Sequence, residues 1–144
     1  MIQRRHNRPA VDKRTPRERA RDTLRALAAQ NPQTTEELKT ACITIAGCLR
    51  GYVASTTAIP AYDLTTNELA RQLKLNDIPA DWITGVIDVL RVCDSVKFAR
   101  DVLELTTIHG MTHATELLVE QYPPASAQSA SPQVKQTQLN GVTA

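Results

Sequence analysis

Aromatic side chains and glycine are scarce in this sequence. Only five of the 144 residues are aromatic (Trp82, Phe98 and three tyrosines), so a core must be built mainly from aliphatic side chains. The five glycines are isolated, and none belongs to a Gly-rich loop that would bind phosphate. With 42% hydrophobic and 22% charged residues, the composition is that of a globular domain large enough to fold without disulfides or metals.

Long apolar runs are also missing. No stretch of 18 apolar residues occurs, so we expect no transmembrane helix within the chain, and the basic and polar residues after Met1 do not resemble a signal peptide. The three cysteines, Cys42, Cys48 and Cys93, show no CxxC spacing and fall in apolar helical stretches, where free cysteine behaves as a small hydrophobic residue. A reducing, cytoplasmic location is therefore the expectation.

Positive charge is concentrated at one end of the chain. Residues 1–25 hold nine basic and three acidic residues, a balance of +6, whereas residues 26–144 hold eight basic and twelve acidic residues, a balance of −4. Residues 1–14 lack apolar periodicity and are predicted to form a flexible basic arm. Residues 125–144 are rich in Ser, Ala, Gln and Thr and are predicted to form a disordered tail.

The residues between these segments predict an all-α fold, a single bundle of about five helices over residues 15–124. Apolar residues recur every three or four positions, and no segment alternates with period two. Three helix starts carry a capping box, in which a threonine is followed three residues later by glutamate. These pairs are Thr15 with Glu18, Thr34 with Glu37, and Thr65 with Glu68.

The remaining helices and some core positions follow from the same spacing. The fourth helix is expected to start at Pro79, and the fifth to run from about Thr107 to Tyr122. In the short third helix, Leu69 and Leu73 are expected to face inward, with Leu75 as a further candidate. Tyr52 is expected to be a half-buried core residue.

No catalytic residues or cofactor are predicted. Cys93 is followed by Asp94, but it falls on the predicted buried stripe with no histidine near in sequence, which favours a packed cysteine over a nucleophile. His109 and His113 have the i, i+4 spacing of metal ligands, and Glu116 extends the same helix face. The glutamate of an HExxH motif is missing, so exposed surface histidines are the favoured interpretation and no metal is assigned.

The basic arm leaves three alternatives open. Arg4, Arg5, Arg8, Lys13 and Arg14 could neutralise nucleic-acid phosphates, although the acidic body and the lack of a recognisable reading helix argue against this. They could instead contact anionic lipid at the inner face of a membrane. A solvated arm with no contact is the third alternative.

Four segments occur in a characteristic order: residues 49–53 (LRGYV), 59–61 (IPA), 64–69 (LTTNEL) and 93–99 (CDSVKFA). In this order they resemble the cytoplasmic C-terminal helical region of BatD-like proteins from bacterial aerotolerance operons. The resemblance covers about residues 34–100, and Gly51 stands where that family has a basic residue. It implies that the basic arm follows a membrane helix, with a free-standing protein beginning at Met1 as the alternative.

The resemblance also implies a function. BatD-like proteins occur beside MoxR-type AAA+ ATPases and von Willebrand A-domain proteins, with no enzymatic residues assigned. We therefore expect a non-catalytic interaction domain, cytoplasmic or held at the inner face of the membrane, that docks to such a partner. Candidate contact residues are the polar side chains near the last motif, Asp94, Lys97 and Arg100. A small nucleic-acid-binding protein that uses the basic arm is the alternative function.

Overall fold

A computed structural model describes residues 13–98 and 104–123 of the chain. The described residues form five α-helices and one short 3-10 helix and contain no strand, which confirms the predicted all-α fold. Several predictions concern residues outside the described ranges: the tail of residues 125–144 and the basic residues Arg4, Arg5, Arg8 and Arg100. The side chain of Lys97 is also outside the description. The elements are α2 (Pro16–Ala29), α3 (Thr35–Thr57), η1 (Ala61–Asp63), α4 (Thr66–Leu75), α5 (Ala80–Phe98) and α6 (Leu105–Gln121).

All three predicted capping boxes are present. At the start of α3, the Glu37 N–H donates to Thr34 Oγ1 at 3.1 Å, and the Glu37 carboxylate accepts from the Thr34 N–H at 3.1 Å. The boxes at the starts of α2 and α4 are built in the same way. They fix three of the helix starts, because each one satisfies two N–H groups that have no partner within the helix. Helix α6 has no such box and begins at Leu105, two residues before the predicted start.

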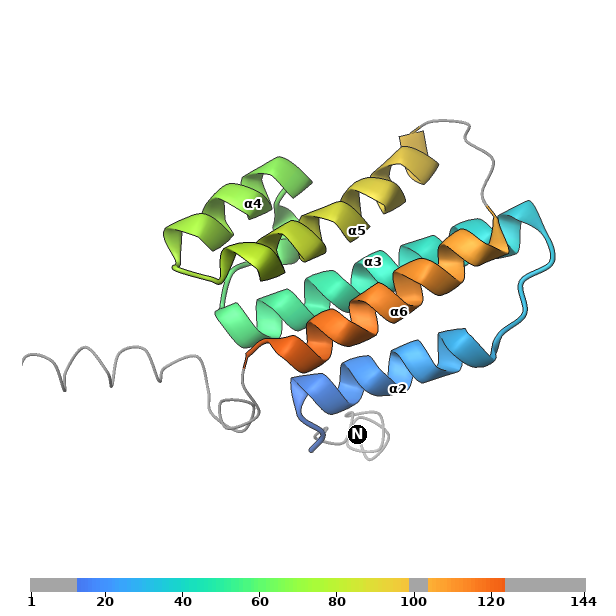
Figure 1. Cartoon of the computed structure of the whole chain (residues 1–144), viewed down its shortest axis with the longest axis horizontal. Coiled ribbons are helices and arrows are strands. Elements are labelled where there is room, and N and C mark those ends of the chain that lie inside the picture. Colours follow the sequence, from blue (N-terminus) through green and yellow to red (C-terminus); the bar gives the residue numbers. More distant parts are fainter. Residues whose placement is uncertain (1–12, 99–103, 124–144) are drawn as a thin grey trace, which may run out of the picture.

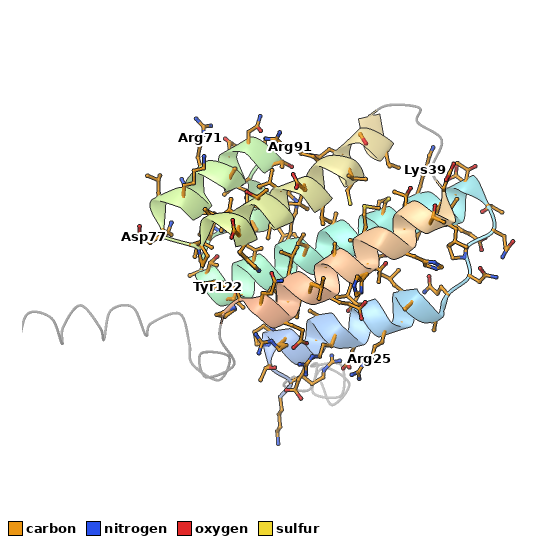
Figure 2. All side chains as sticks on the ribbon, in the orientation of Figure 1. Arg25, Lys39, Arg71, Asp77, Arg91 and Tyr122 are labelled. Carbon is orange, nitrogen blue, oxygen red and sulfur yellow. The ribbon has the colours of Figure 1, made fainter. Side chains whose placement is uncertain are left out.

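Helices α3 and α6 form the central pair of the bundle. Helix α2 packs against both of them along one flank, α5 packs against both along the other, and α4 covers the outer side of α5 (Figure 1). The buried side chains between them are mainly Leu, Ile, Val and Ala, as the composition predicts. Charged side chains such as Arg25, Lys39, Arg71 and Arg91 point outward (Figure 2).

Two predicted burial positions are wrong. Leu75 is 75% exposed, because it lies two residues beyond the buried Leu73 and therefore projects from nearly the opposite side of α4. Tyr52 is not half-buried but only 2% exposed, because α3 is enclosed by α2 and α6 at that point.

The described helices can be compared with the length and composition of a transmembrane helix. In residues 13–98 and 104–123, no helix combines the length and the apolar composition needed to cross a bilayer. This finding concerns the described helices alone.

The end of α3 gives a test of the backbone geometry. Ala58 has φ 63° and ψ 13°, a left-handed conformation that costs a residue with a Cβ atom about 1 kcal/mol and glycine little. We expect Ala58→Gly to raise the free energy of unfolding by about 0.5 kcal/mol, since the greater freedom of glycine in the unfolded chain offsets part of the gain.

Ala26, exposed within α2, provides the control. Ala26→Gly should lower the free energy of unfolding by about 1 kcal/mol. Urea denaturation measures both values, and a loss of stability in Ala58→Gly would contradict the assigned backbone conformation.

Candidate docking surface on helix α3

One side of α3 lies between α2 and α5, and it is exposed in its first half and overlaid by η1 in its second half. Seven residues at spacings of three and four form this stripe, and all of them are exposed or half-buried. Four of them are alanine or glycine, so the stripe is shallow and another backbone could approach it closely. We refer to this stripe as the α3 face, which consists of Lys39, Ile43, Ala46, Gly47, Arg50, Gly51 and Ala54.

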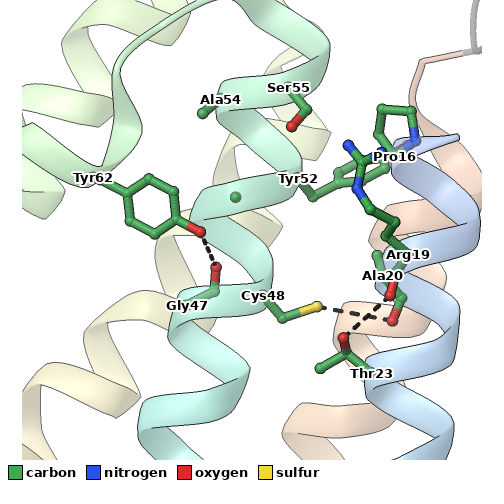
Figure 3. Close-up of a pocket in the computed structure, with 11 residues that line it drawn as sticks. Pro16, Arg19, Ala20, Thr23, Gly47, Cys48, Tyr52, Ala54, Ser55 and Tyr62 are labelled. Carbon is green, nitrogen blue, oxygen red and sulfur yellow. Dashed lines mark hydrogen bonds between the residues drawn. The ribbon is translucent and has the colours of Figure 1, made fainter. Parts of the chain in front are cut away.

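A hollow of about 380 Å³ lies on the α2 side of the α3 face (Figure 3). Tyr62 of η1 lies across one edge of it, 65% exposed, and its hydroxyl donates to the Gly47 carbonyl oxygen at 3.1 Å. This position requires glycine at residue 51, because a Cβ atom there would lie 2.5 Å from the Tyr62 hydroxyl. Sequence reasoning did not single out Tyr62, whose exposure depends on how η1 folds back onto α3.

The thiol of Cys48 faces the same hollow from α3. Its Sγ lies 3.8 Å from the Ala20 carbonyl oxygen of α2, and burial raises the pKa of this thiol to about 11. Cys48 is therefore a neutral thiol at physiological pH, and the nucleophilic thiolate is disfavoured.

A smaller cavity of about 170 Å³ lies on the α5 side of the α3 face. Its walls carry Lys39, Ile43 and Arg50 from α3 and Asp94 from α5, one of the predicted contact residues. Asp94 is half-buried, and its carboxylate accepts a hydrogen bond from the Thr66 hydroxyl at 2.6 Å. The carboxylate therefore links α5 to the start of α4 as well as bordering the cavity.

Arg50 completes this polar network. Its guanidinium donates to the carbonyl oxygens of Ala61 at 2.6 Å and Leu64 at 2.8 Å, and to Thr66 Oγ1 at 3.2 Å. The connection between α3 and α4 is thereby held beside the α3 face. Residues from three of the segments quoted for the family resemblance thus meet in one network with Asp94, which gives those segments a structural role.

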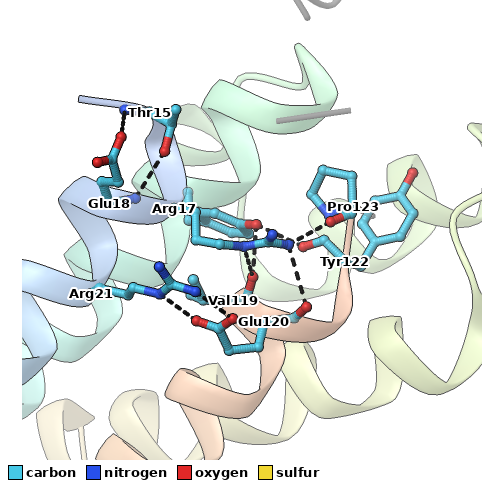
Figure 4. Close-up of polar contacts among 9 residues, drawn as sticks. Thr15, Arg17, Glu18, Arg21, Val119, Glu120, Tyr122 and Pro123 are labelled. Carbon is cyan, nitrogen blue, oxygen red and sulfur yellow. Dashed lines mark hydrogen bonds and ion pairs between the residues drawn. The ribbon is translucent and has the colours of Figure 1, made fainter. Parts of the chain in front are cut away.

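Side chains of α2, α3 and α5 meet at the end of α6, and Figure 4 shows the contacts that Arg17 and Arg21 of α2 make there. Arg17 of α2, only 7% exposed, donates to the carbonyl oxygens of Val119 at 2.9 Å, Glu120 at 3.3 Å and Pro123 at 2.6 Å. The final carbonyl groups of a helix have no N–H partner further along it, and here the contacts of Val119 and Pro123 with Arg17 are buried. Arg17 therefore caps α6 from another helix.

Two further side chains donate to the same end of α6. The Tyr52 hydroxyl of α3 lies 2.8 Å from the Tyr122 carbonyl oxygen and 3.0 Å from that of Val119. The indole Nε1 of Trp82, from α5, donates to the Leu118 carbonyl oxygen at 2.8 Å. Helix α3 and its two neighbours, α2 and α5, are thus each tied to α6 by one buried polar side chain. We call this set of contacts the α6 junction.

Two of the predicted basic contact residues, Lys13 and Arg14, lie within the described ranges, and they differ in their contacts. Lys13 is exposed, whereas Arg14 forms an ion pair with Asp22 at 2.7 Å. Arg21, one turn beyond Arg17, pairs with the Glu120 carboxylate, and this hydrogen bond lowers the pKa of Glu120. Much of the positive charge in the described start of the chain is therefore engaged within the fold.

The three candidates for metal ligands on α6 do not form a cluster that could hold an ion. His109 and His113 are exposed on α6, and Glu116 is half-buried. Across the described ranges, no group of three or more His, Cys, Asp or Glu side chains is arranged to hold a metal ion.

The α6 junction can be tested by comparing two arginines on α2. Arg17→Met keeps most of the side-chain volume but removes the donor to the Glu120 and Pro123 carbonyl oxygens, while the Val119 oxygen still accepts from Tyr52, so we expect a loss of about 2 kcal/mol in the free energy of unfolding. Arg21→Met breaks only the exposed pair with Glu120 and should cost less than about 1 kcal/mol. Chemical denaturation of both variants measures the difference, and equal losses would contradict the capping role of Arg17.

Comparison with protein-family models, with curated proteins and with solved structures finds no match to this chain. The function is therefore inferred from the α3 face, its two hollows and the residues that carry the family resemblance.

Proposed function

We propose that this protein is a non-catalytic interaction domain that binds an amphipathic helix of a partner protein along the α3 face. The observation that carries the proposal is the α3 face, with Ile43 58% exposed in its open half, Tyr62 of η1 65% exposed over its other half, and a hollow on either side. Grooves between helices bind the apolar side of a partner helix through residues spaced at i, i+3, i+4 and i+7. The small residues of the α3 face suit that close approach.

The charges around the α3 face indicate the chemistry of the partner helix. Arg19 borders the hollow on the α2 side, and Lys39 and Arg50 border the cavity on the α5 side, with Asp94 as the acidic group there. A partner helix with acidic residues beside its apolar stripe would complement this excess of positive charge. In this proposal Asp94, one of the candidate contact residues from the sequence, would lie at the edge of the contact surface.

The α6 junction supports the proposal by holding the groove in shape before binding. Helices α2, α3 and α5 are each fixed to α6 through hydrogen bonds, donated by Arg17, Tyr52 and Trp82 in that order. A preformed groove loses less conformational entropy on binding than one that must be ordered by its partner.

The family resemblance supplies the proposed partner and place. In BatD-like proteins the helical region lies on the cytoplasmic side of the bacterial inner membrane, beside MoxR-type AAA+ ATPases and von Willebrand A-domain proteins. We propose an AAA+ ATPase of this type as the partner, with the basic residues before α2 directed at the anionic membrane surface. The first and last described residues, 13 and 123, lie at the same end of the bundle.

The nucleic-acid alternative has less support from the described residues. Arg17 is buried, and Arg14 and Arg21 are paired with carboxylates. Binding to phosphates by this end of the chain would then depend on residues 1–12 together with Lys13, Arg19 and Arg25. Salt-dependent DNA binding that disappears when residues 1–12 are removed would favour this alternative over the docking proposal.

Matched charge substitutions test the docking proposal. Binding of the purified full chain to a MoxR-type ATPase from the same operon is measured by isothermal titration calorimetry. Ile43→Glu places a carboxylate on the α3 face and should weaken binding at least about 10-fold, because it would be desolvated beside acidic partner residues. Leu75→Glu, on the exposed side of α4, should leave the affinity unchanged.

Two outcomes would count against the proposal. If Ile43→Glu binds as tightly as the unmodified chain, the α3 face is not the contact surface. If the ATPase does not bind the unmodified chain, the proposed partner is wrong. Circular dichroism of both variants checks that the helices are retained.

A further inference from the structure

Three sulfur atoms from three helices meet in the core below the α3 face. The Sγ of Cys93 on α5 lies 4.0 Å from the Sδ of Met111 on α6 and 3.6 Å from the carbonyl oxygen of Cys42 on α3. Cys42 and Cys93 also line one cavity, and a hydrogen bond from the Cys93 thiol lowers the pKa of Cys42. All three side chains are between 2% and 6% exposed. We refer to Cys42, Cys93 and Met111 as the sulfur cluster.

The spacing in the sulfur cluster suits a soft metal ion. Metal–sulfur bonds are about 2.3 Å long, so three sulfur ligands at the corners of a trigonal site lie about 4 Å apart. The observed 4.0 Å between Cys93 Sγ and Met111 Sδ agrees with that spacing. Thiolate and thioether ligands favour Cu(I), whereas structural Zn²⁺ takes four ligands in tetrahedral geometry.

The sulfur cluster has a route to solvent and nearby positive charge. Cys42 and Cys93 both line the cavity of about 170 Å³ on the α5 side of the α3 face. Lys39 and Ile43, which are exposed, line the same cavity, so it reaches the surface. Two thiolates and one monovalent ion leave one net negative charge. The cavity wall carries two cations, Lys39 and Arg50, and one carboxylate, Asp94, so its net positive charge would balance that negative charge.

We propose that Cys42, Cys93 and Met111 form a binding site for a single Cu(I) ion. On binding, each thiol loses its proton to solvent, the two thiolates and the thioether bond to the ion, and copper keeps its oxidation state. The site ties α3, α5 and α6 together, so binding also stabilises the fold. This proposal goes beyond the docking function and does not depend on it.

Anaerobic titration of the reduced full chain with Cu(I), in competition with a chromogenic Cu(I) chelator, tests the site. We expect the protein to withdraw one equivalent of Cu(I) and its melting temperature to rise. X-ray absorption at the copper edge should show sulfur ligands at about 2.3 Å and no nitrogen or oxygen ligand. Failure to withdraw Cu(I), or a first shell of nitrogen or oxygen, would overturn the proposal.

Single substitutions identify the ligands, and the third cysteine is the control. Cys93→Ala should weaken Cu(I) binding about 100-fold or more, and Met111→Leu, which preserves the core volume, about 10-fold. Cys48 lies on the α2 side of α3, and Cys48→Ala should leave Cu(I) binding unchanged.

Folding of the variants does not limit the test. Met111→Leu is expected to fold, and the absorption spectrum of the unmodified chain needs no variant. Unchanged Cu(I) affinity in Met111→Leu, or equal losses in Cys48→Ala and Cys93→Ala, would overturn the assigned ligand set.

Discussion

Hydrogen bonds to the end of α6 are the interaction on which the arrangement of the other helices depends. The carbonyl groups of Leu118 and Val119, in the last turn of α6, lie in buried contacts, where they would lose hydrogen bonds to water unless the protein supplied donors. Arg17, Tyr52 and Trp82 supply donors from α2, α3 and α5, so one requirement of backbone chemistry positions three helices. Apolar packing drives the helices together, but it does not by itself select which ends must meet.

The α6 junction and the α3 face are connected through the same helices. Fixing α2 and α5 on opposite flanks of α3 leaves the outer stripe of α3 to solvent in its first half and to η1 in its second half, with hollows on both sides. Glycine and alanine keep that stripe shallow, and Tyr62 is the one large side chain that lies over Gly51. The sulfur cluster lies beneath the same surface, where α3, α5 and α6 converge, so metal binding and docking would act on neighbouring parts of one groove.

Local signals were enough to predict the helices but not their meeting points. A capping box needs only a threonine and a glutamate three residues apart, so all three could be recognised from the sequence. The contact between Arg17 and Val119 spans 102 residues, and no local pattern reports it. One signal was available: Arg17 lies in the first turn of α2, where the helix dipole disfavours a cation, which indicates a partner elsewhere. The sulfur cluster likewise required the packing of three helices to become visible.

The most direct measurement of the α6 junction is a double-mutant cycle that combines Tyr52→Phe with Arg17→Met. Both side chains donate to the Val119 carbonyl oxygen, so either one can still satisfy that oxygen when the other is removed. Removing both should therefore lower the free energy of unfolding by about 1 kcal/mol more than the sum of the single losses. Strict additivity of the two losses would contradict a shared junction at the end of α6.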